Sequence, residues 1–242
     1  MRQVLLLARR ELSTFFNTWW GWSILALVLL LDGVLFNAFA VRLSEARFSN
    51  DVLEDFFFFS SGTTMIAGVL LSMRSLAEER QAGTMVLLQT SPITEAQIVL
   101  GKFLGAFAFL TIVTVSTLYL PALIEINGKV SWAHIFTGYT GLLLLGGVSL
   151  AMGTFGSSLT KHQLVAAMFA AVALTLCLMG WYISEEIAPP LKAPIAYLAL
   201  YEEHFESFQQ GLFDWRSVVF FLSMIGGFLL MATQVLKTRR FQ

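Results

Sequence analysis

The chain has 242 residues, of which 57% are hydrophobic and only 13% are charged. Soluble domains carry about 25% charged residues, so this composition excludes an ordinary soluble protein and indicates an integral membrane protein. The formal net charge is −1, and no nucleic-acid partner is expected. The lipid bilayer itself is the first partner that the composition predicts.

The stretch that opens the chain, MRQVLLLARRELSTFF, is predicted to be an uncleaved amphipathic helix that lies along the membrane surface. It begins like a signal peptide, but Arg9, Arg10 and Glu11 interrupt a short apolar run and no small-residue cleavage site lies nearby. The apolar side of the predicted helix includes Leu5 and Leu12, while its arginines reach toward lipid head groups.

Six apolar runs follow that are long enough to cross a bilayer, since the hydrocarbon core takes about 20 apolar residues per helix. They predict spans at about 20–41, 56–73, 103–124, 134–155, 164–183 and 217–236. The connecting segments are too short for a further folded domain of ordinary size. The sequence therefore predicts one all-α membrane domain, residues 1–242, with six transmembrane helices.

The distribution of basic residues predicts the orientation of these spans. With both termini in the cytoplasm, ten of the fifteen cations fall in inside segments. These are Arg2, Arg9, Arg10, Arg74, Arg80, Lys102, Lys161, Lys237, Arg239 and Arg240, and the outside loops hold Arg42, Arg47, Lys129, Lys192 and Arg216. Because cytoplasmic loops carry the excess of Lys and Arg, we expect cytoplasmic termini.

The segment 74–102 between the second and third runs is unusually polar for this chain. Its patterns Ser75-x-x-Glu78 and Thr94-x-x-Gln97 both match the capping box, a signal for the start of a helix. Gly83 and Pro92 lie between them, and neither residue type suits a helix interior. We therefore expect helix, break, short helix, break and helix. A helix as short as TMVLLQT is marginal alone, so it needs membrane helices or a soluble partner to pack against.

At these residues the sequence resembles a known family. The stretch RSLAEERQAGTMVLLQTSPITEAQIVLGK is similar to the segment after the second span of ABC-2 type permeases, the membrane subunits of ATP-binding cassette exporters. The final stretch, HFESFQQGLFDWRSVVFFLSMIGGFLLMATQVLKTRR, resembles the end of the same proteins, most closely the gliding-motility-associated permeases. The resemblance implies a bacterial inner-membrane protein with a coupling helix that sits in a groove of a separate ATPase.

The resemblance also assigns roles to residues of the segment. Glu78, Glu79 and Arg80 would face the ATPase, Gly83 and Thr84 would start the coupling element, Met85, Leu87 and Leu88 would supply apolar anchors, and Pro92 would turn the chain into the third span. The implied partners are two ATPase copies, a second permease that is identical or paralogous, and a periplasmic or other envelope protein.

The sequence carries no motif for catalysis or for nucleotide binding. It lacks the P-loop pattern, because Gly101-Lys102 and Gly128-Lys129 have neither the upstream glycine nor the following Ser or Thr. The histidines show no zinc-ligand spacing. We therefore expect a chain that is not an enzyme, with no cofactor or metal of its own, and with ATP and Mg²⁺ bound by the partner ATPase.

Two further features depart from a plain bundle of spans. Asp32 falls halfway along the first run, where a carboxylate is costly. It either lines a translocation path or joins helices by hydrogen bonds, with Asn37 as the candidate partner. The outer loop 184–216 contains the apolar stretch PIAYLAL, which is too short to cross the bilayer and is typical of a re-entrant or interfacial segment.

The sequence thus favours an ABC-2 type permease over two other classes. A gradient-driven transporter or channel would need several intramembrane charges or paired broken helices. Asp32 is the one charged residue that lies within the predicted spans. A noncatalytic membrane scaffold would use the Pro-rich outer loop as its contact. The capped and broken segment 74–102 distinguishes the permease from both.

Overall fold

The computed structural model describes residues 2–40, 48–85, 93–127, 130–186 and 192–239. Within these ranges the chain forms helices and no β-strand. The first half contains α1 (Arg2–Asn17), α2 (Trp19–Leu35), the π-helical η1 (Phe36–Ala40), α3 (Ser49–Ser72), α4 (Ala77–Gln81) and α6 (Glu95–Ser116). The second half contains α7 (Tyr119–Asn127), α8 (Trp132–Leu159), α9 (Gln163–Leu178), α10 (Gly180–Glu186), α11 (Lys192–Tyr197), the π-helical η2 (Tyr201–Phe205), α12 (Glu206–Gln209) and α13 (Trp215–Arg239).

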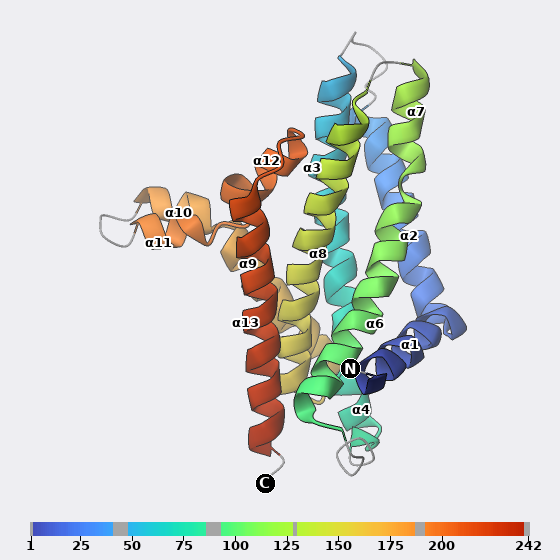
Figure 1. Cartoon of the computed structure of the whole chain (residues 1–242), viewed down its shortest axis with the longest axis vertical. Coiled ribbons are helices and arrows are strands. Elements are labelled where there is room, and N and C mark those ends of the chain that lie inside the picture. Colours follow the sequence, from blue (N-terminus) through green and yellow to red (C-terminus); the bar gives the residue numbers. More distant parts are fainter. Residues whose placement is uncertain (1, 41–47, 86–92, 128–129, 187–191, 240–242) are drawn as a thin grey trace.

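The protein is an all-α integral membrane protein. In the described ranges five helical stretches are long and apolar enough to cross a membrane, and α9 with α10 forms a sixth as a pair bent by 49°. The long helices stand side by side, and both termini lie at the end of the bundle that carries α4 (Figure 1). We call this the α4 end.

Two of the helical elements differ from the predicted runs in an informative way. The helix of the second run begins at Ser49, seven residues before the predicted 56, because the polar turn SNDVLED is helical as well as the apolar stretch. The third run is broken near Thr117 into α6 and α7. Pro121 explains this break, since a proline ring clashes with the carbonyl four residues earlier and lacks the N–H of a helix interior.

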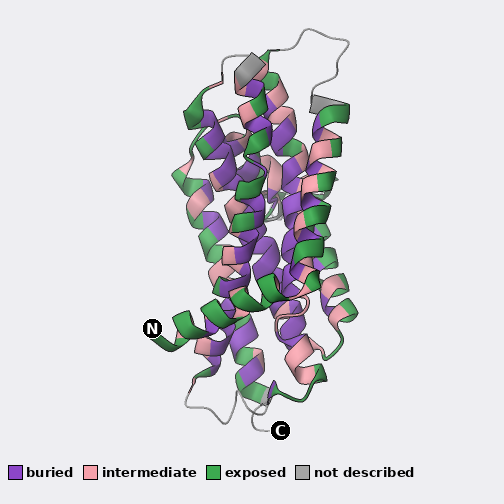
Figure 2. Ribbon diagram, turned by 90° about the vertical axis from the view of Figure 1, so that its right-hand side faces the viewer, coloured by how far each residue is buried: buried purple, intermediate pink, exposed green. Residues whose placement is uncertain are grey.

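Buried residues line the interior of the bundle (Figure 2), and most residues of α8 are buried. The contact of α8 with α3 depends on glycine. A Cβ on Gly153 would lie 1.8 Å from Ser72 Oγ, and a Cβ on Gly68 would lie 2.1 Å from Ser149 Oγ. Small residues let helices approach closely in lipid, where van der Waals packing drives association, so these glycines fix the α3–α8 distance.

Helix α1 lies across the α4 end rather than along the bundle (Figure 1). Leu7 packs against Gly101 of α6, and the Phe15 and Phe109 rings stack with centroids 5.1 Å apart. Leu5 and Leu6 are exposed. The helix is therefore fixed to α6 on one side and presents apolar side chains outward on another, as an interfacial helix does.

Candidate functional site

The segment after α3 folds back onto the bundle as the short helix α4 (Figure 1). Leu76 is the N-cap residue of α4, and no side chain caps it. The predicted Ser75-Glu78 capping box is therefore wrong. Helix α4 ends at Gln81 with Ala82 as its C-cap residue, and Gly83 follows with a φ of 72°, the left-handed conformation that favours glycine after a helix.

A residue of α8 replaces the missing cap. The Leu76 and Ala77 amides donate hydrogen bonds to Ser157 Oγ at 2.9 and 2.8 Å. The Ser157 hydroxyl in turn donates to the Met73 carbonyl at 3.3 Å. One serine from the end of α8 thus satisfies the first amides of α4 and attaches this helix to the bundle.

A buried ion-pair network joins α4 to two other helices. Lys102 of α6 is only 3% exposed, and its Nζ lies 2.7 Å from Glu11 Oε1 of α1 and 2.8 Å from Glu79 Oε1 of α4. A buried charge is tolerated when it is paired and hydrogen-bonded. The lysine therefore holds α1, α4 and α6 together at one point.

The remaining charges of α4 are also engaged. Arg80 Nη1 donates to the Ser158 carbonyl at 2.5 Å. Arg74 forms a bidentate pair with Glu78, with Nε donating to Oε2 at 2.9 Å. The Arg74 guanidinium also lies over the Trp20 ring, 5.4 Å from its centroid. Helix α4 is thus fastened to the bundle along its length.

Apart from Arg80, described above, the predicted site residues of the segment 74–102 fall into three groups: exposed residues, residues turned into the protein, and residues outside the described ranges. Glu78 is 45% exposed, whereas the Glu79 side chain is 13% exposed and turned toward Lys102. Gly83 and Thr84 lie on the surface, and Met85 is buried in the core of the α4 end. Leu87, Leu88 and Pro92 lie outside the described residues.

The second predicted capping box is confirmed at the start of α6. The Gln97 amide donates to Thr94 Oγ1, and the Gln97 side chain accepts from the Thr94 amide at 3.1 Å. The segment therefore re-enters the bundle at a defined residue. Between α4 and this cap, the chain runs through the residues that the resemblance assigns to ATPase contact.

Asp32 lies in α2 and is 3% exposed. Its Oδ1 accepts a hydrogen bond from Thr63 Oγ1 of α3 at 2.6 Å. Asn37 is exposed and makes no hydrogen bond to Asp32 among the described contacts. The geometry therefore gives Asp32 a structural partner on the neighbouring helix, and Thr63 takes the place expected of Asn37.

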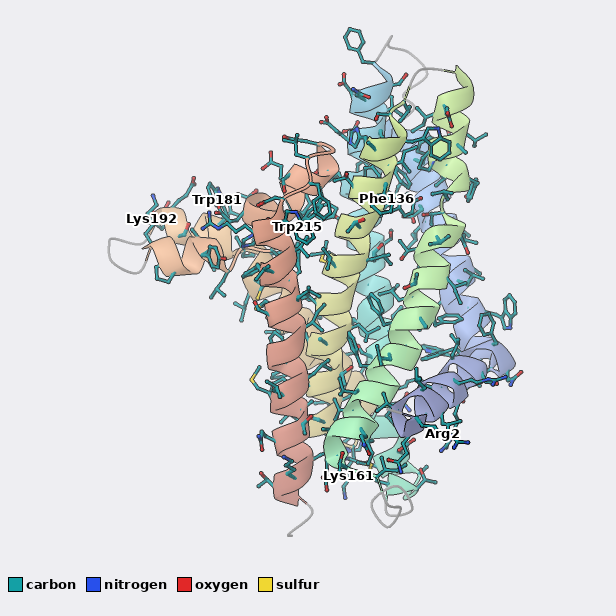
Figure 3. All side chains as sticks on the ribbon, viewed as in Figure 1. Arg2, Phe136, Lys161, Trp181, Lys192 and Trp215 are labelled. Carbon is teal, nitrogen blue, oxygen red and sulfur yellow. The ribbon has the colours of Figure 1, made fainter. Side chains whose placement is uncertain are left out.

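Helix α12 packs against the end of the bundle opposite to α4. Gln209 of α12 links α3 and α8, because its side chain donates to the Glu54 carbonyl at 3.1 Å and its own carbonyl lies 2.7 Å from His134 Nε2. Helices α10 and α11 instead project sideways, with Trp181 and Lys192 on the projection (Figure 3). Across the described ranges, no three His, Cys, Asp or Glu side chains gather as a metal site would require.

The comparison with known families covers nearly the whole chain. The model for ABC-2 family transporter proteins matches residues 5–241. The chain belongs to this family. It is therefore a multi-pass membrane subunit of the ABC transporter type, a class that works with an ABC ATPase and is not generally catalytic itself. No curated protein matches the sequence at a significant level.

Three residues that organise the α4 end are not among the site residues predicted from the sequence. Ser157, Lys102 and Glu11 anchor α4, yet their partners lie between 23 and 91 positions away in the chain. The one signal in the sequence is Lys102 itself, a charge placed directly before the third apolar run. Such a lysine in a membrane helix needs an acidic partner or a route to the interface.

Proposed function

We propose that this ABC-2 family protein is a permease subunit that couples ATP hydrolysis by a separate ATPase to work in the membrane. The observation that carries the proposal is the attachment of α4 to α8 through Ser157 and Arg80 and to α6 through the Glu79–Lys102 pair. Lys102 also pairs with Glu11, which adds α1 to the group. A short helix fixed in this way moves with α1, α6 and α8 as one body. A displacement imposed on it therefore reaches several spans.

The assembly that fits this role contains two ATPase copies and a second permease, identical or paralogous. ATP and Mg²⁺ bind to the ATPase subunits, and this chain contributes no cofactor site. The α4 end faces the cytoplasm of a bacterial inner membrane in this proposal, with both termini on that side. The clustering of Arg74, Arg80, Lys102 and Lys161 at this end supports the orientation.

The contact with the ATPase is formed by α4 together with the residues that follow it up to Pro92. Glu78, Gly83 and Thr84 supply its described surface, and Leu87 and Leu88 are proposed as the apolar anchors. Met85 and Glu79 face the protein, so they position this contact segment rather than touch the ATPase. Pro92 turns the chain toward the Thr94 cap.

The work performed is export of a substrate or mechanical action on an envelope partner. The resemblance of the C-terminal stretch to gliding-motility-associated permeases supports the mechanical form. In that form the sideways α10–α11 projection and α12 at the outer end offer a surface to a periplasmic or other envelope protein. Relative movement of the outer surface is then the output of the ATP cycle.

The test is tagged purification in mild detergent, with mass spectrometry of the copurifying proteins and an ATPase assay. We expect wild type to bring down an ABC ATPase in stoichiometric amount. The double substitution Leu87→Asp plus Leu88→Asp is expected to lose at least nine tenths of it, because aspartate cannot fill an apolar groove.

Leu212→Asp is the matched control, since Leu212 is 62% exposed at the opposite end of the bundle. This variant is expected to retain the ATPase. Retention of the ATPase by the double variant, or its absence from wild type in every mild detergent, contradicts the coupling proposal.

A further inference from the structure

A polar cleft of about 210 Å³ lies at the α4 end, between α1, the start of α2, the end of α3, α4 and α6. Its walls carry as many cations as carboxylates, namely Arg10, Arg74 and Lys102 against Glu11, Glu78 and Glu79. A single water needs only about 10–15 Å³ of such space. The cleft is therefore large enough for a small polar group.

Three polar atoms of these walls are buried and make no hydrogen bond within the described part of the chain. They are Trp20 Nε1, Ser75 Oγ and Glu79 Oε2. The indole nitrogen only donates, the ionised carboxylate only accepts, and the hydroxyl does both. Buried polar groups are almost always paired, so the cleft suits a ligand that brings acceptors and donors together.

The internal ion pairs show which charges remain for such a ligand. Lys102 is occupied by Glu11 and Glu79, and Arg74 is occupied by Glu78. Arg10 is exposed and forms no ion pair with a described residue. The cleft thus offers one cation for an anionic group and one free carboxylate oxygen, Glu79 Oε2, for an ammonium group.

The surroundings of the cleft are those of the membrane interface. Leu6 and Phe16 of α1 are 60% and 38% exposed, and Trp19 and Trp22 at the start of α2 are 76% and 56% exposed. Exposed tryptophans at the end of a span lie at the level of the lipid head groups. The cleft therefore opens where phospholipid head groups are the most abundant ligand.

We propose that this cleft binds the phosphoethanolamine head group of a phospholipid from the leaflet at the α4 end. The phosphate accepts hydrogen bonds from Arg10, Trp20 Nε1 and the Ser75 hydroxyl, and the ammonium donates to Glu79 Oε2. A choline head group has no N–H to donate, and a glycerol head group brings no positive charge. The balanced charges of the walls therefore select the zwitterion with a free ammonium.

The test measures lipid retention by native mass spectrometry of the detergent-solubilised protein. Phosphatidylethanolamine, phosphatidylcholine and phosphatidylglycerol with the same acyl chains are added in turn. We expect one phosphatidylethanolamine to be retained at least tenfold more strongly than either competitor. Equal retention of phosphatidylglycerol or phosphatidylcholine overturns the proposal.

The variant Trp20→Phe plus Ser75→Ala is expected to lower this retention at least tenfold. It removes the indole N–H and the hydroxyl, while the phenylalanine keeps a ring beneath Arg74. The matched control is Trp19→Phe plus Ser23→Ala, which changes the same residue types at exposed positions outside the cleft. The control is expected to behave as wild type, and unchanged retention by the cleft variant overturns the proposal.

Two further arms keep the proposal falsifiable. If the double cleft variant does not fold, Arg10→Gln replaces it, because that side chain is exposed, and retention must still fall. Soluble phosphoethanolamine and inorganic phosphate test the source of the ligand. If either displaces the lipid at equal concentration, the cleft is a site for a soluble ligand and the lipid assignment is wrong. Lipid retention is measured without the ATPase, so this result stands apart from the coupling proposal.

Discussion

Lys102 Nζ of α6 lies 2.8 Å from Glu79 Oε1 of α4, and the lysine is only 3% exposed. The same ammonium lies 2.7 Å from Glu11 Oε1 of α1. This pairing places a full charge in the interior of the α4 end and balances it with carboxylates from two separate segments. The Glu79–Lys102 pair therefore fixes the position of α4 relative to the third span. Its loss would leave a buried charge without a partner.

Lys102→Met is expected to destabilise the protein by about 3–5 kcal/mol, because removal of one partner of a buried ion pair leaves the other uncompensated. Thermal unfolding in detergent measures the effect. Lys161→Met is the matched control, since Lys161 is exposed in the turn between α8 and α9, and it is expected to unfold as wild type does.

Addition of Glu11→Gln and Glu79→Gln to Lys102→Met removes the uncompensated carboxylates. The triple variant is expected to regain part of the lost stability, because a buried uncharged amide without a partner costs less than a buried unpaired carboxylate. A triple variant that is less stable than Lys102→Met alone contradicts the assignment of the network.

Ser157→Ala is expected to loosen α4 without unfolding the bundle. The substitution leaves the buried amides of Leu76 and Ala77 without their acceptor, and each unpaired buried group costs about 1–3 kcal/mol. Hydrogen exchange over residues 76–81 is the measurement, and we expect exchange to accelerate at least tenfold there.

Ser158→Ala provides the comparison for Ser157→Ala. Within the described part of the chain, the Ser158 hydroxyl donates only to the Phe155 carbonyl of its own helix, so its loss is expected to leave exchange in α4 unchanged. Equal effects of the two substitutions argue against Ser157 as the cap of α4.

The two capping boxes show what the sequence predicts and where prediction ends. The Thr94-Gln97 box is confirmed because both of its hydrogen bonds join residues three positions apart. The Ser75-Glu78 box fails because Glu78 pairs with Arg74 and a serine 81 positions away from Leu76 supplies the acceptor. Hydrogen bonds between residues close in the sequence can be predicted from it. A competing contact with a residue far along the chain cannot.

The same distinction applies to the polar groups inside the bundle. The position of Asp32 within a span predicts that it needs a partner, but the pattern cannot choose between residues on its own helix and on others. Thr63 is the partner because α2 packs against α3 at that level. The helical spans themselves follow from apolar length, which is a property of the local sequence.

A double-mutant cycle on Asp32 and Thr63 tests whether this hydrogen bond joins α2 to α3. Asp32→Ala and Thr63→Val are each expected to destabilise the protein, with a coupling energy of about 1 kcal/mol, typical of hydrogen bonds between membrane helices. Asp32→Asn keeps an acceptor oxygen, so we expect it to retain stability and activity. Loss of activity by a fully stable Asp32→Asn variant assigns Asp32 to a translocation path instead.

Gly153→Ala is expected to separate α8 from α3. The new Cβ would lie 1.8 Å from Ser72 Oγ and 2.8 Å from Ser72 Cβ, and overpacking of this kind typically costs about 1–3 kcal/mol. Gly226→Ala is the control, because a Cβ there meets nothing within 4 Å. Unfolding in detergent is expected to show a loss for the first and none for the second, and addition of Ser72→Ala is expected to recover part of the loss.

The segment between α11 and α13 is expected to make stability depend on pH through His204, which is 1% exposed. His204 Nε2 lies 3.0 Å from the Tyr197 carbonyl, which can only accept, and Nδ1 lies 3.3 Å from Ser217 Oγ. Burial lowers the pKa of His204 below its usual 6.5 and outweighs the Tyr197 carbonyl, which raises it. Among the charged neighbours, Glu203 and Asp214 raise this pKa and Arg216 lowers it.

A histidine whose pKa is lower in the folded state binds fewer protons there than in the unfolded state, so stability rises with pH. The destabilising effect of His204 is absent when the pH is well above 6.5. It grows as the pH falls through 6.5 toward the pKa of the folded state. The Asp214 pKa lies below its usual 3.8, chiefly because its carboxylate accepts a hydrogen bond from the Arg216 amide. Protonation of that carboxyl therefore affects stability at more acidic pH.

His204→Gln keeps an amide donor for Tyr197 but cannot titrate. Unfolding temperatures between pH 7.5 and pH 5.0 are therefore expected to fall less for this variant than for wild type, whereas the exposed control His162→Gln keeps the full slope. An unchanged slope in His204→Gln means that another group supplies the pH dependence.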